Sequence, residues 1–380
     1  MFSNTKMVLR GLVIFVVFAS LTGACGPSSS SGKGNDGSIT DDSTTTDGGL
    51  HQDGSTDDSG KHEAGIEGCD PKDFVLQQAP PPQVFLVVDR SGSMLEAGSD
   101  PQKTKWEELI TAIESVLTQF EGQIQFGLLM YPTGNECGTS GPQVQVALHN
   151  KLGVLHFLNQ ATPAGGTPTA AAVTNAAHAL QALDAGSDKF IILATDGGPN
   201  CNYGLSADPQ CSCSLTDQNY CCTNYPDGQC VFGQYCLDDD HTASVLGDLH
   251  SNSTIDTFVI GLAGTAEYAE TLNAMADSGG RAQSGPVHYY DASDQTALTN
   301  ALTDIAGSVI SCRIDLDEAP DEPDYVLIYM DGTQVPRDPN NGWDYTDDSH
   351  MAIELYGDAC DTLKSGNDHV ITATFACEVQ

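Results

Sequence analysis

The sequence predicts an α/β fold: a doubly wound, mostly parallel sheet with helices on both faces, together with a disulfide-rich insert and a small C-terminal β-rich module. Two observations predict it. Between residues 83 and 311, short apolar runs alternate with segments whose apolar residues recur at helical spacing. Strands that are regularly followed by helices form a mostly parallel sheet that is covered on both faces. From residue 312 onward only short β-rich runs occur, which indicates a separate module.

The first strand is expected at residues 83–88, because a continuous apolar run suits a strand that is buried on both faces. The helix that follows, 105–120, has apolar residues at helical spacing from Trp106 to Phe120. The same patterns predict further strands at 124–130, 144–148, 190–194, 257–262 and 287–290, and further helices at 152–158, 169–183, 242–250, 267–275 and 295–309. In such sheets ligands bind at the carboxyl ends of the strands, near the switch in strand order.

The N-terminal segment has the pattern of an export signal. Lys6 and Arg10 precede a short apolar run, which small residues follow. A membrane anchor helix is the alternative. Because Cys25 stands directly after the small residues, the segment resembles a bacterial lipoprotein signal, which implies a lipidated Cys25 and attachment to the cell envelope. The residue after Cys25 is Gly26 and not Asp, which, by resemblance to enterobacterial lipoprotein sorting, favours the outer membrane. Without lipidation, the chain would be secreted and Cys25 would be one more thiol.

The segment after the signal is expected to be a disordered tether. It is rich in Ser, Thr, Gly and Asp and shows no apolar period, so burial cannot offset its ordering entropy. The expected parts of the chain are a signal at 1–24, the tether at 25–78, the sheet domain at 79–311 with its insert at 197–237, and the module at 312–380.

The charge balance limits the partners. The 380 residues include 52 Asp and Glu against 14 Lys and Arg, a formal net charge of −38. Nucleic acids and anionic lipid surfaces are bound through basic patches that displace counterions. We therefore expect no nucleic-acid partner, and contact with a membrane only through the N-terminal lipid.

The cysteines predict disulfides. If Cys25 carries lipid, twelve of the 13 cysteines remain, an even number that an oxidising compartment would pair. Seven lie between residues 201 and 236, where aliphatic residues are scarce, so disulfides rather than a core would hold the insert. Because seven is odd, at least one pairs outside the insert, and Cys137 is the candidate. A cysteine-rich zinc knot is the alternative.

Three polar segments stand where the sheet would place a ligand. Residues 89–93 follow the first strand, 165–169 precede a helix, and 195–198 follow a later apolar strand. Their side chains offer carboxylate and hydroxyl oxygens, which suit a hard divalent cation, and none offers imidazole or thiolate. Taken singly, each segment is better explained as a helix cap or a turn than as part of a metal site.

Together and in this order, the segments resemble the von Willebrand factor type A domain with its metal-ion-dependent adhesion site. The signature is Asp-x-Ser-x-Ser after the first strand, a Thr in a Gly-rich loop, and an Asp after a later strand. The resemblance covers about residues 83–311 and implies a Rossmann-like fold and an ion that is Mg²⁺, or Mn²⁺ or Ca²⁺. It also implies an open coordination position for a partner's carboxylate. The metal ligands that it implies are Asp89, Ser91, Ser93, Thr167 and Asp196.

These features lead to one functional hypothesis and one alternative. The hypothesis is a non-enzymatic, metal-dependent binding protein of adhesion type, which coordinates an Asp or Glu of a partner protein. The alternative is a structural or assembly protein of the envelope, in which the metal only stabilises the fold. A hydrolase is not favoured, because the chain has neither a Gly-x-Ser-x-Gly nor a His-Glu-x-x-His motif. The insert would emerge beside Asp196, where it could set specificity or serve only as a stabilising staple.

The C-terminal module is expected to be stapled by cysteines. Asp331-Gly332 is a hairpin turn signal between β-rich runs. Trp343 and Tyr345 either close a small core or form an exposed aromatic patch for a sugar or peptide. The cysteines available as staples are Cys312, Cys360 and Cys377, with Cys69 as a partner for the odd one.

Overall fold

The structure of the chain is a computed structural model. It describes residues 73–74, 76–134, 136–202, 205, 235–367 and 369–375, and at 73, 74 and 375 only the backbone. The expected signal, Cys25, most of the tether and most of the cysteine-rich insert lie outside the described residues. In the part of the chain that is described, no helix has both the length and the apolar character needed to cross a membrane.

The sheet domain is built on six strands in the order β5-β4-β3-β6-β7-β8. All neighbouring strands pair in parallel except β4 and β5, which are antiparallel. This is the mostly parallel sheet that the alternating pattern predicts. Its strands are β3 (Gln83–Asp89), β4 (Gln125–Tyr131), β5 (Val144–Ala147), β6 (Lys189–Thr195), β7 (Ile255–Leu262) and β8 (Tyr290–Ala292).

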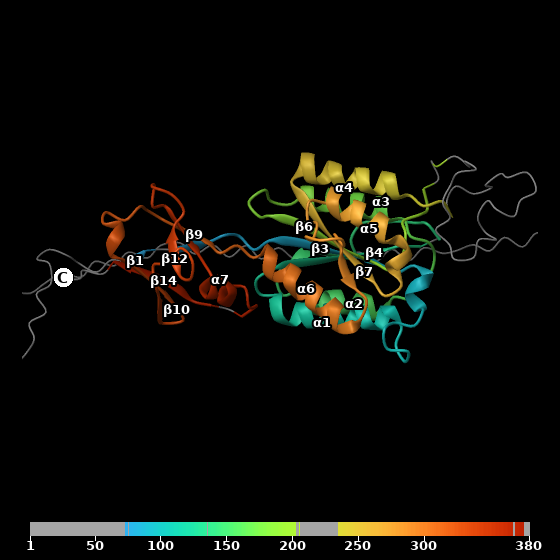
Figure 1. The fold of residues 1–380 in the computed structure, drawn as a ribbon, viewed down its shortest axis with the longest axis horizontal. Coiled ribbons are helices and arrows are strands. Elements are labelled where there is room, and N and C mark those ends of the chain that lie inside the picture. The colour runs from blue at the N-terminus through green and yellow to red at the C-terminus, as the bar shows by residue number, and fades with distance from the viewer. Residues whose placement is uncertain are drawn as a thin grey trace, which may run out of the picture. The chain divides into compact units, whose positions relative to one another are not determined.

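Helices cover both faces of this sheet, which confirms the doubly wound architecture (Figure 1). Alternate residues of β3 enter two separate cores: Leu86 packs with α1, α2 and α6, whereas Phe85 packs with α3, α4 and α5. Because both faces of β3 are covered, its central residues are apolar without interruption, and only the first and last residues, Gln83 and Asp89, are polar. The helices are α1 (Lys105–Phe120), α2 (Lys151–Gln160), α3 (Thr169–Gln181), α4 (Asp239–Ser253), α5 (Ala269–Ser278) and α6 (Gln295–Val309).

The expected strand at 287–290 is displaced. The strand β8 begins at Tyr290 and pairs with the last residues of β7. Val287, which the apolar pattern places inside the strand, is 37% exposed. Gly285 and Pro286 directly precede it, so the chain reaches the sheet later than the apolar residues alone indicate.

The β-rich module consists of two four-stranded sheets, in the orders β1-β14-β10-β11 and β12-β13-β9-β2. Its first two strands lie before the sheet domain in sequence: β1 (Asp73–Phe74) pairs with β14, and β2 (Leu76–Gln78) pairs with β9. The expected tether therefore extends too far, because its last residues are strands of the module. The other strands are β9 (Arg313–Leu316), β10 (Val326–Met330), β11 (Thr333–Val335), β12 (Trp343–Tyr345), β13 (Ala352–Leu355) and β14 (Ile371–Phe375), with a short helix α7 (Asp358–Leu363).

The module has its own core, and Trp343 lies in it with 1% of its surface exposed. Burial excludes this indole from a sugar-binding patch, so the core interpretation of the aromatic pair is confirmed for Trp343. A disulfide joins Cys312 to Cys360, two of the cysteines expected as staples. The expected hairpin at Asp331-Gly332 connects β10 to β11, and both turn residues have positive φ, at 51° and 77°.

Candidate metal centre

The candidate site lies where the strand order switches. The chain passes from β3 through α1 to β4 on one side, and returns through α3 to β6 on the other side of β3. The strands β3 and β6 are parallel neighbours, and they end at Asp89 and Thr195 respectively. Loops that leave such neighbouring strands in opposite directions leave a crevice between them. Asp89 and Asp196 are thus brought to one edge of the sheet, although 107 positions separate them in the chain.

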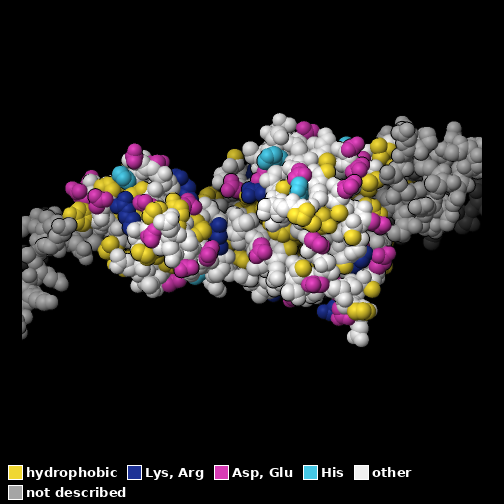
Figure 2. Space-filling view, in the orientation of Figure 1, with side chains coloured by type: hydrophobic (Ala, Val, Ile, Leu, Met, Phe, Trp, Pro, Cys, Tyr) yellow, Lys and Arg dark blue, Asp and Glu magenta, His cyan; other side chains and the backbone are white. Residues whose placement is uncertain are grey.

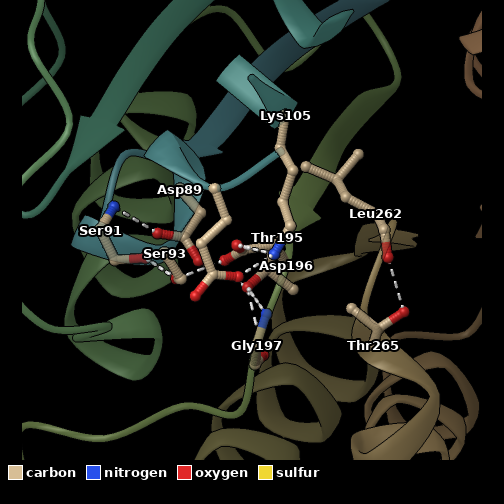
Figure 3. Close-up of polar contacts among 10 residues, drawn as sticks. Asp89, Ser91, Ser93, Lys105, Thr195, Asp196, Gly197, Leu262 and Thr265 are labelled. Carbon is tan, nitrogen blue, oxygen red and sulfur yellow. Dashed lines mark hydrogen bonds and ion pairs between the residues drawn. The ribbon is translucent and has the colours of Figure 1, made fainter. Parts of the chain in front are cut away.

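Asp89 is buried with 0% of its surface exposed, and neighbouring groups hold both of its carboxylate oxygens. The backbone N–H of Ser91 donates to Oδ1 at 2.8 Å, and the hydroxyl of Thr195 donates to Oδ2 at 2.6 Å. Figure 3 shows these two contacts from the β3 and β6 exits. These two hydrogen bonds therefore fix the orientation of the carboxylate.

Asp196 stands in front of Asp89 and is also buried, with 4% of its surface exposed. The Ser93 hydroxyl donates to its Oδ1 at 2.9 Å, and the Lys105 ammonium donates to its Oδ2 at 2.9 Å (Figure 3). The hydroxyl oxygens of Ser91 and Ser93 lie 3.0 Å apart. Residues of the first and third sequence motifs thus form one connected network.

Thr167 reaches the same place through backbone contacts. The N–H of Gly92 donates to the carbonyl of Gly165 at 3.0 Å, which ties the Gly-rich loop to the loop after β3. The N–H of Thr167 donates to Oδ1 of Asn200 at 2.7 Å, and the N–H of Asn200 donates back to the Thr167 carbonyl at 2.9 Å. Gly165 has a φ of +92° and a Cβ there would lie 2.7 Å from the carbonyl oxygen of Glu136, so this position requires glycine.

A disulfide fastens the loops of the site. Cys137 is bonded to Cys201, which confirms Cys137 as the partner of a cysteine at the edge of the insert. The N–H of Gly166 donates to the carbonyl of Glu136 at 2.8 Å, directly beside Cys137. Cys201 in turn follows Asn200, the residue that holds Thr167. The disulfide therefore links the loop after β4 to the loop after β6, with the Thr167 loop between them.

The three loops surround an open cleft of about 350 Å³. Ser91, Ser93, Thr167 and Asp196 line it, and Asp89 lies beneath them in contact with Ser91. All five side chains that the sequence singles out are therefore gathered at one place. The other polar side chains that line the cleft are those of Glu96, Lys105, Asn200, Glu267 and Tyr268.

Burial and charge shift the acidities of both carboxyl groups. Burial, together with the nearby charge of Asp196, raises the pKa of Asp89 from 3.8 to about 7, although hydrogen bonds from Thr195 and Ser91 oppose the change. Burial also raises the pKa of Asp196, and Lys105 and Ser93 counteract it. Two buried carboxylates this close repel each other, so a cation between them would be strongly favoured.

The donor set fits a hard divalent cation. It comprises two carboxylates and three hydroxyl groups, with no thiolate or imidazole, and Mg²⁺, Mn²⁺ and Ca²⁺ prefer such oxygen ligands. The ammonium of Lys105 against Asp196 shows that this position attracts positive charge. Across the described ranges, no three side chains of His, Cys, Asp and Glu gather as a metal-binding group, so a metal here would depend on the hydroxyls.

Comparison with protein families gives a match at the same elements. The family model of the von Willebrand factor type A domain matches residues 83–304, more than half of the chain. The chain belongs to this family. The matched von Willebrand factor type A region begins at the first residue of β3 and ends within α6, so it contains every loop of the cleft. No curated protein sequence matches the chain.

Several solved structures are similar to the chain. The open conformation of the pilus adhesin SpaC from Lactobacillus rhamnosus GG is 17% identical, with a TM-score of 0.45, over 79% of this chain and 39% of SpaC. The vWF domain of the type V pili tip protein Mfa5 from Porphyromonas gingivalis is 14% identical, with a TM-score of 0.44, over 61% of this chain and 96% of that domain. The manganese-loaded TRAP protein of Plasmodium vivax is 14% identical, with a TM-score of 0.42, over 81% of this chain and 98% of TRAP.

Three residues of the site are absent from the set that the sequence predicts: Lys105, Thr195 and Asn200. Thr195 directly precedes Asp196, and its place at the end of an apolar strand is a usable signal. Asn200 has no signal of its own, because it acts through a loop whose course the sequence does not show. Lys105 is the first residue of an amphipathic helix, where a lysine is expected to point into solvent.

Proposed function

We propose that the chain is a divalent-metal-dependent protein-binding module of adhesion type, anchored in the cell envelope. Asp89, Ser91, Ser93, Thr167 and Asp196 would hold Mg²⁺, or Mn²⁺ or Ca²⁺. The metal would supply an electrophilic centre for a carboxylate of a partner protein. The observation that carries the proposal is the convergence of two buried carboxylates and three hydroxyl-bearing side chains on one open cleft.

The charge balance supports binding of a third carboxylate. Two carboxylates neutralise a divalent ion, and hydroxyl ligands add no charge, so the metal retains its attraction for an incoming Asp or Glu. The cleft is open and has room for a side chain of the partner. On the face shown in Figure 2, Asp and Glu side chains are scattered widely and Lys and Arg are fewer, as the net charge of −38 leads one to expect. The metal would therefore reverse the sign of the field only locally.

The hydroxyl groups of the site support binding rather than catalysis. Ser91 and Ser93 contact each other, and Ser93 donates to Asp196. Among the described residues that line the cleft, none is His or Cys. A serine nucleophile needs an adjacent base, most often His, and no His lines the described cleft. The carboxylate that Ser93 contacts, Asp196, is paired with the ammonium of Lys105. We therefore propose a non-enzymatic role.

Attachment to the envelope would come from the lipid on Cys25, with the outer membrane as the proposed location. The support is the resemblance of residues 1–25 to a lipoprotein signal. The variant Cys25→Ala is expected to leave the membrane fraction and to appear in the soluble fraction of the envelope. Retention of this variant in the membrane would contradict the lipid anchor.

Calorimetry with Mg²⁺ tests the metal site. Asp89→Ala and Asp196→Ala should abolish measurable binding, because each removes half of the charge that holds the ion. Asp291→Ala is the matched control, since Asp291 is exposed on β8 and does not line the cleft. Unchanged Mg²⁺ binding in Asp89→Ala would end the proposal.

Capture from the native envelope, with and without chelator, separates binding from a purely structural metal. The proposed function requires that a partner be lost in chelator while circular dichroism shows the domain still folded. The structural alternative predicts the reverse: the same partner is captured in both conditions, and chelator lowers only the melting temperature.

A further inference from the structure

Lys105 occupies an unusual position for a lysine. It is the first residue of α1, where the helix dipole disfavours positive charge, yet only 7% of its surface is exposed. Burying an ammonium group is costly unless carboxylates compensate it. The position of Lys105 in the helix therefore does not explain why its side chain is buried. The explanation must lie in the groups that its ammonium contacts.

The partners are two carboxylates of different kinds. The ammonium nitrogen lies 2.9 Å from Oδ2 of Asp196, which is fully buried, and 2.9 Å from Oε2 of Glu96, whose side chain is 64% exposed. One partner belongs to the candidate metal site, and the other lies at its rim and can follow a moving side chain. The ammonium of Lys105 thus bridges a buried carboxylate of the site and an exposed carboxylate at its rim.

The backbone around the ammonium leaves space for it. A Cβ at Gly264 would lie 3.2 Å from Nζ of Lys105, and the φ of Gly264 is +97°. Among the described residues that line the cleft, Lys105 is the only basic one, against the acidic Glu96, Asp196 and Glu267. The ammonium is therefore the internal counter-charge of an otherwise acidic cleft.

We propose that Lys105 is a tethered competitor of the metal: its ammonium takes the cation position at Asp196 when no divalent ion is bound, and metal binding displaces it toward Glu96. The inference rests on the proposed metal site. It assigns to Lys105 the control of metal affinity, and to Glu96 the role of receiving the displaced ammonium. Without metal, the ion pair keeps Asp196 compensated and the loops in place. With metal, the ammonium at the rim adds a second positive group for an acidic ligand.

Calorimetry of the full chain with Mg²⁺ tests the competition. Lys105→Gln should bind Mg²⁺ at least about tenfold more tightly, because it removes a positive charge that faces a divalent ion across a shared carboxylate. Glu96→Gln should bind Mg²⁺ more weakly, because the ammonium then has Asp196 as its remaining carboxylate. A merely structural role would weaken binding in both variants. Lys103→Gln is the matched control: Lys103 is exposed two positions earlier, and its removal should leave the affinity unchanged.

Amine labelling of the unsubstituted chain, read by mass spectrometry, tests the displacement without any variant. Lys105 should be labelled slowly in chelator and faster in saturating Mg²⁺, while labelling of Lys103 stays constant. Mg²⁺ binding that leaves both the labelling of Lys105 and the affinity of Lys105→Gln unchanged would overturn the inference alone. Absence of Mg²⁺ binding in the unsubstituted chain and in Lys105→Gln would overturn the metal site itself, and the inference with it.

Discussion

The two edges of the central sheet each carry an aspartate paired with a cation, but the pairs are built differently. At the carboxyl edge, where the carboxyl ends of the strands lie, Asp196 lines an open cleft and accepts from the ammonium of Lys105 and the hydroxyl of Ser93. At the amino edge, Asp256 accepts from Nε of Arg281 at 2.7 Å, and its other oxygen lies 2.7 Å from Nδ1 of His250.

The guanidinium at the amino edge is also held by aromatic rings. Its carbon lies 5.1 Å from the ring centroid of Phe190 and 5.3 Å from that of Phe258. A planar cation stacked between rings and a carboxylate has little freedom to leave. The proposed exchange of the Lys105 ammonium at Asp196 therefore contrasts with an ion pair at Asp256 whose cation is held by a carboxylate and two aromatic rings.

The largest expected effect concerns the disulfide of the carboxyl edge. Cys137→Ser/Cys201→Ser removes a cross-link that spans 64 positions, and Cys312→Ser/Cys360→Ser, the matched control in the module, removes one that spans 48. Loop-closure entropy predicts that each pair costs about 4 kcal/mol of stability. Only the first should also weaken Mg²⁺ binding, since it fastens the loops of Thr167 and Asn200. Equal Mg²⁺ affinity in the two folded variants would show that the disulfide does not position the site.

The next effect concerns pH and Asp89. The folded-state pKa of Asp89, about 7, exceeds its ordinary value of 3.8. Because the folded-state pKa is raised, the folded chain favours the protonated carboxyl group. The resulting stability is fully present below pH 3.8 and is lost as the pH rises through about 7. The full pKa shift means that ionising Asp89 costs roughly 4 kcal/mol of folding stability, a cost that Asp89→Asn removes. The same substitution loses a hydrogen bond to Asp89, which costs about 1–2 kcal/mol.

In chelator at pH 8, Asp89→Asn should therefore be more stable than the unsubstituted chain by about 2–3 kcal/mol, measured by urea unfolding. At pH 4 the gain should vanish, and in Mg²⁺ at pH 8 the order should reverse, because Asn cannot supply the charge that holds the ion. A variant that is less stable than the unsubstituted chain in chelator at every pH would contradict the strained burial of Asp89.

The smallest effect concerns the amino edge. Arg281→Gln should cost about 2 kcal/mol, because it removes a charged hydrogen bond and the stacking on Phe190 and Phe258. The loss should be the same in Mg²⁺ and in chelator, and the Mg²⁺ affinity should not change. A metal-dependent loss would mean that the two edges are coupled, and the contrast between them would fail.

Much of this architecture follows from local patterns. The unbroken apolar run predicts β3, because a strand buried on both faces is apolar at consecutive positions. The helical spacing of apolar residues predicts α1, because this helix is buried on one face. Counting predicts that at least one of the seven cysteines of the insert pairs outside it, since seven cannot all pair among themselves, but it does not by itself select Cys137 or Cys201. The sequence does not show the boundary of the module: β1 and β2 are short, and only their pairing with β14 and β9 shows where they belong.

The candidate site divides in the same way. The sequence alone predicts the fold class. Through its resemblance to the signature of the von Willebrand factor type A domain, it also singles out Asp89, Ser91, Ser93, Thr167 and Asp196 as a set. Only the tertiary structure brought Lys105 to Asp196 and Asn200 to Thr167. Lys105 and Asp196 are 91 positions apart in the chain, and Thr167 and Asn200 are 33 positions apart. Whether such residues meet depends on how the helices and loops pack. A periodic pattern records which face of an element is buried, but not which neighbour buries it.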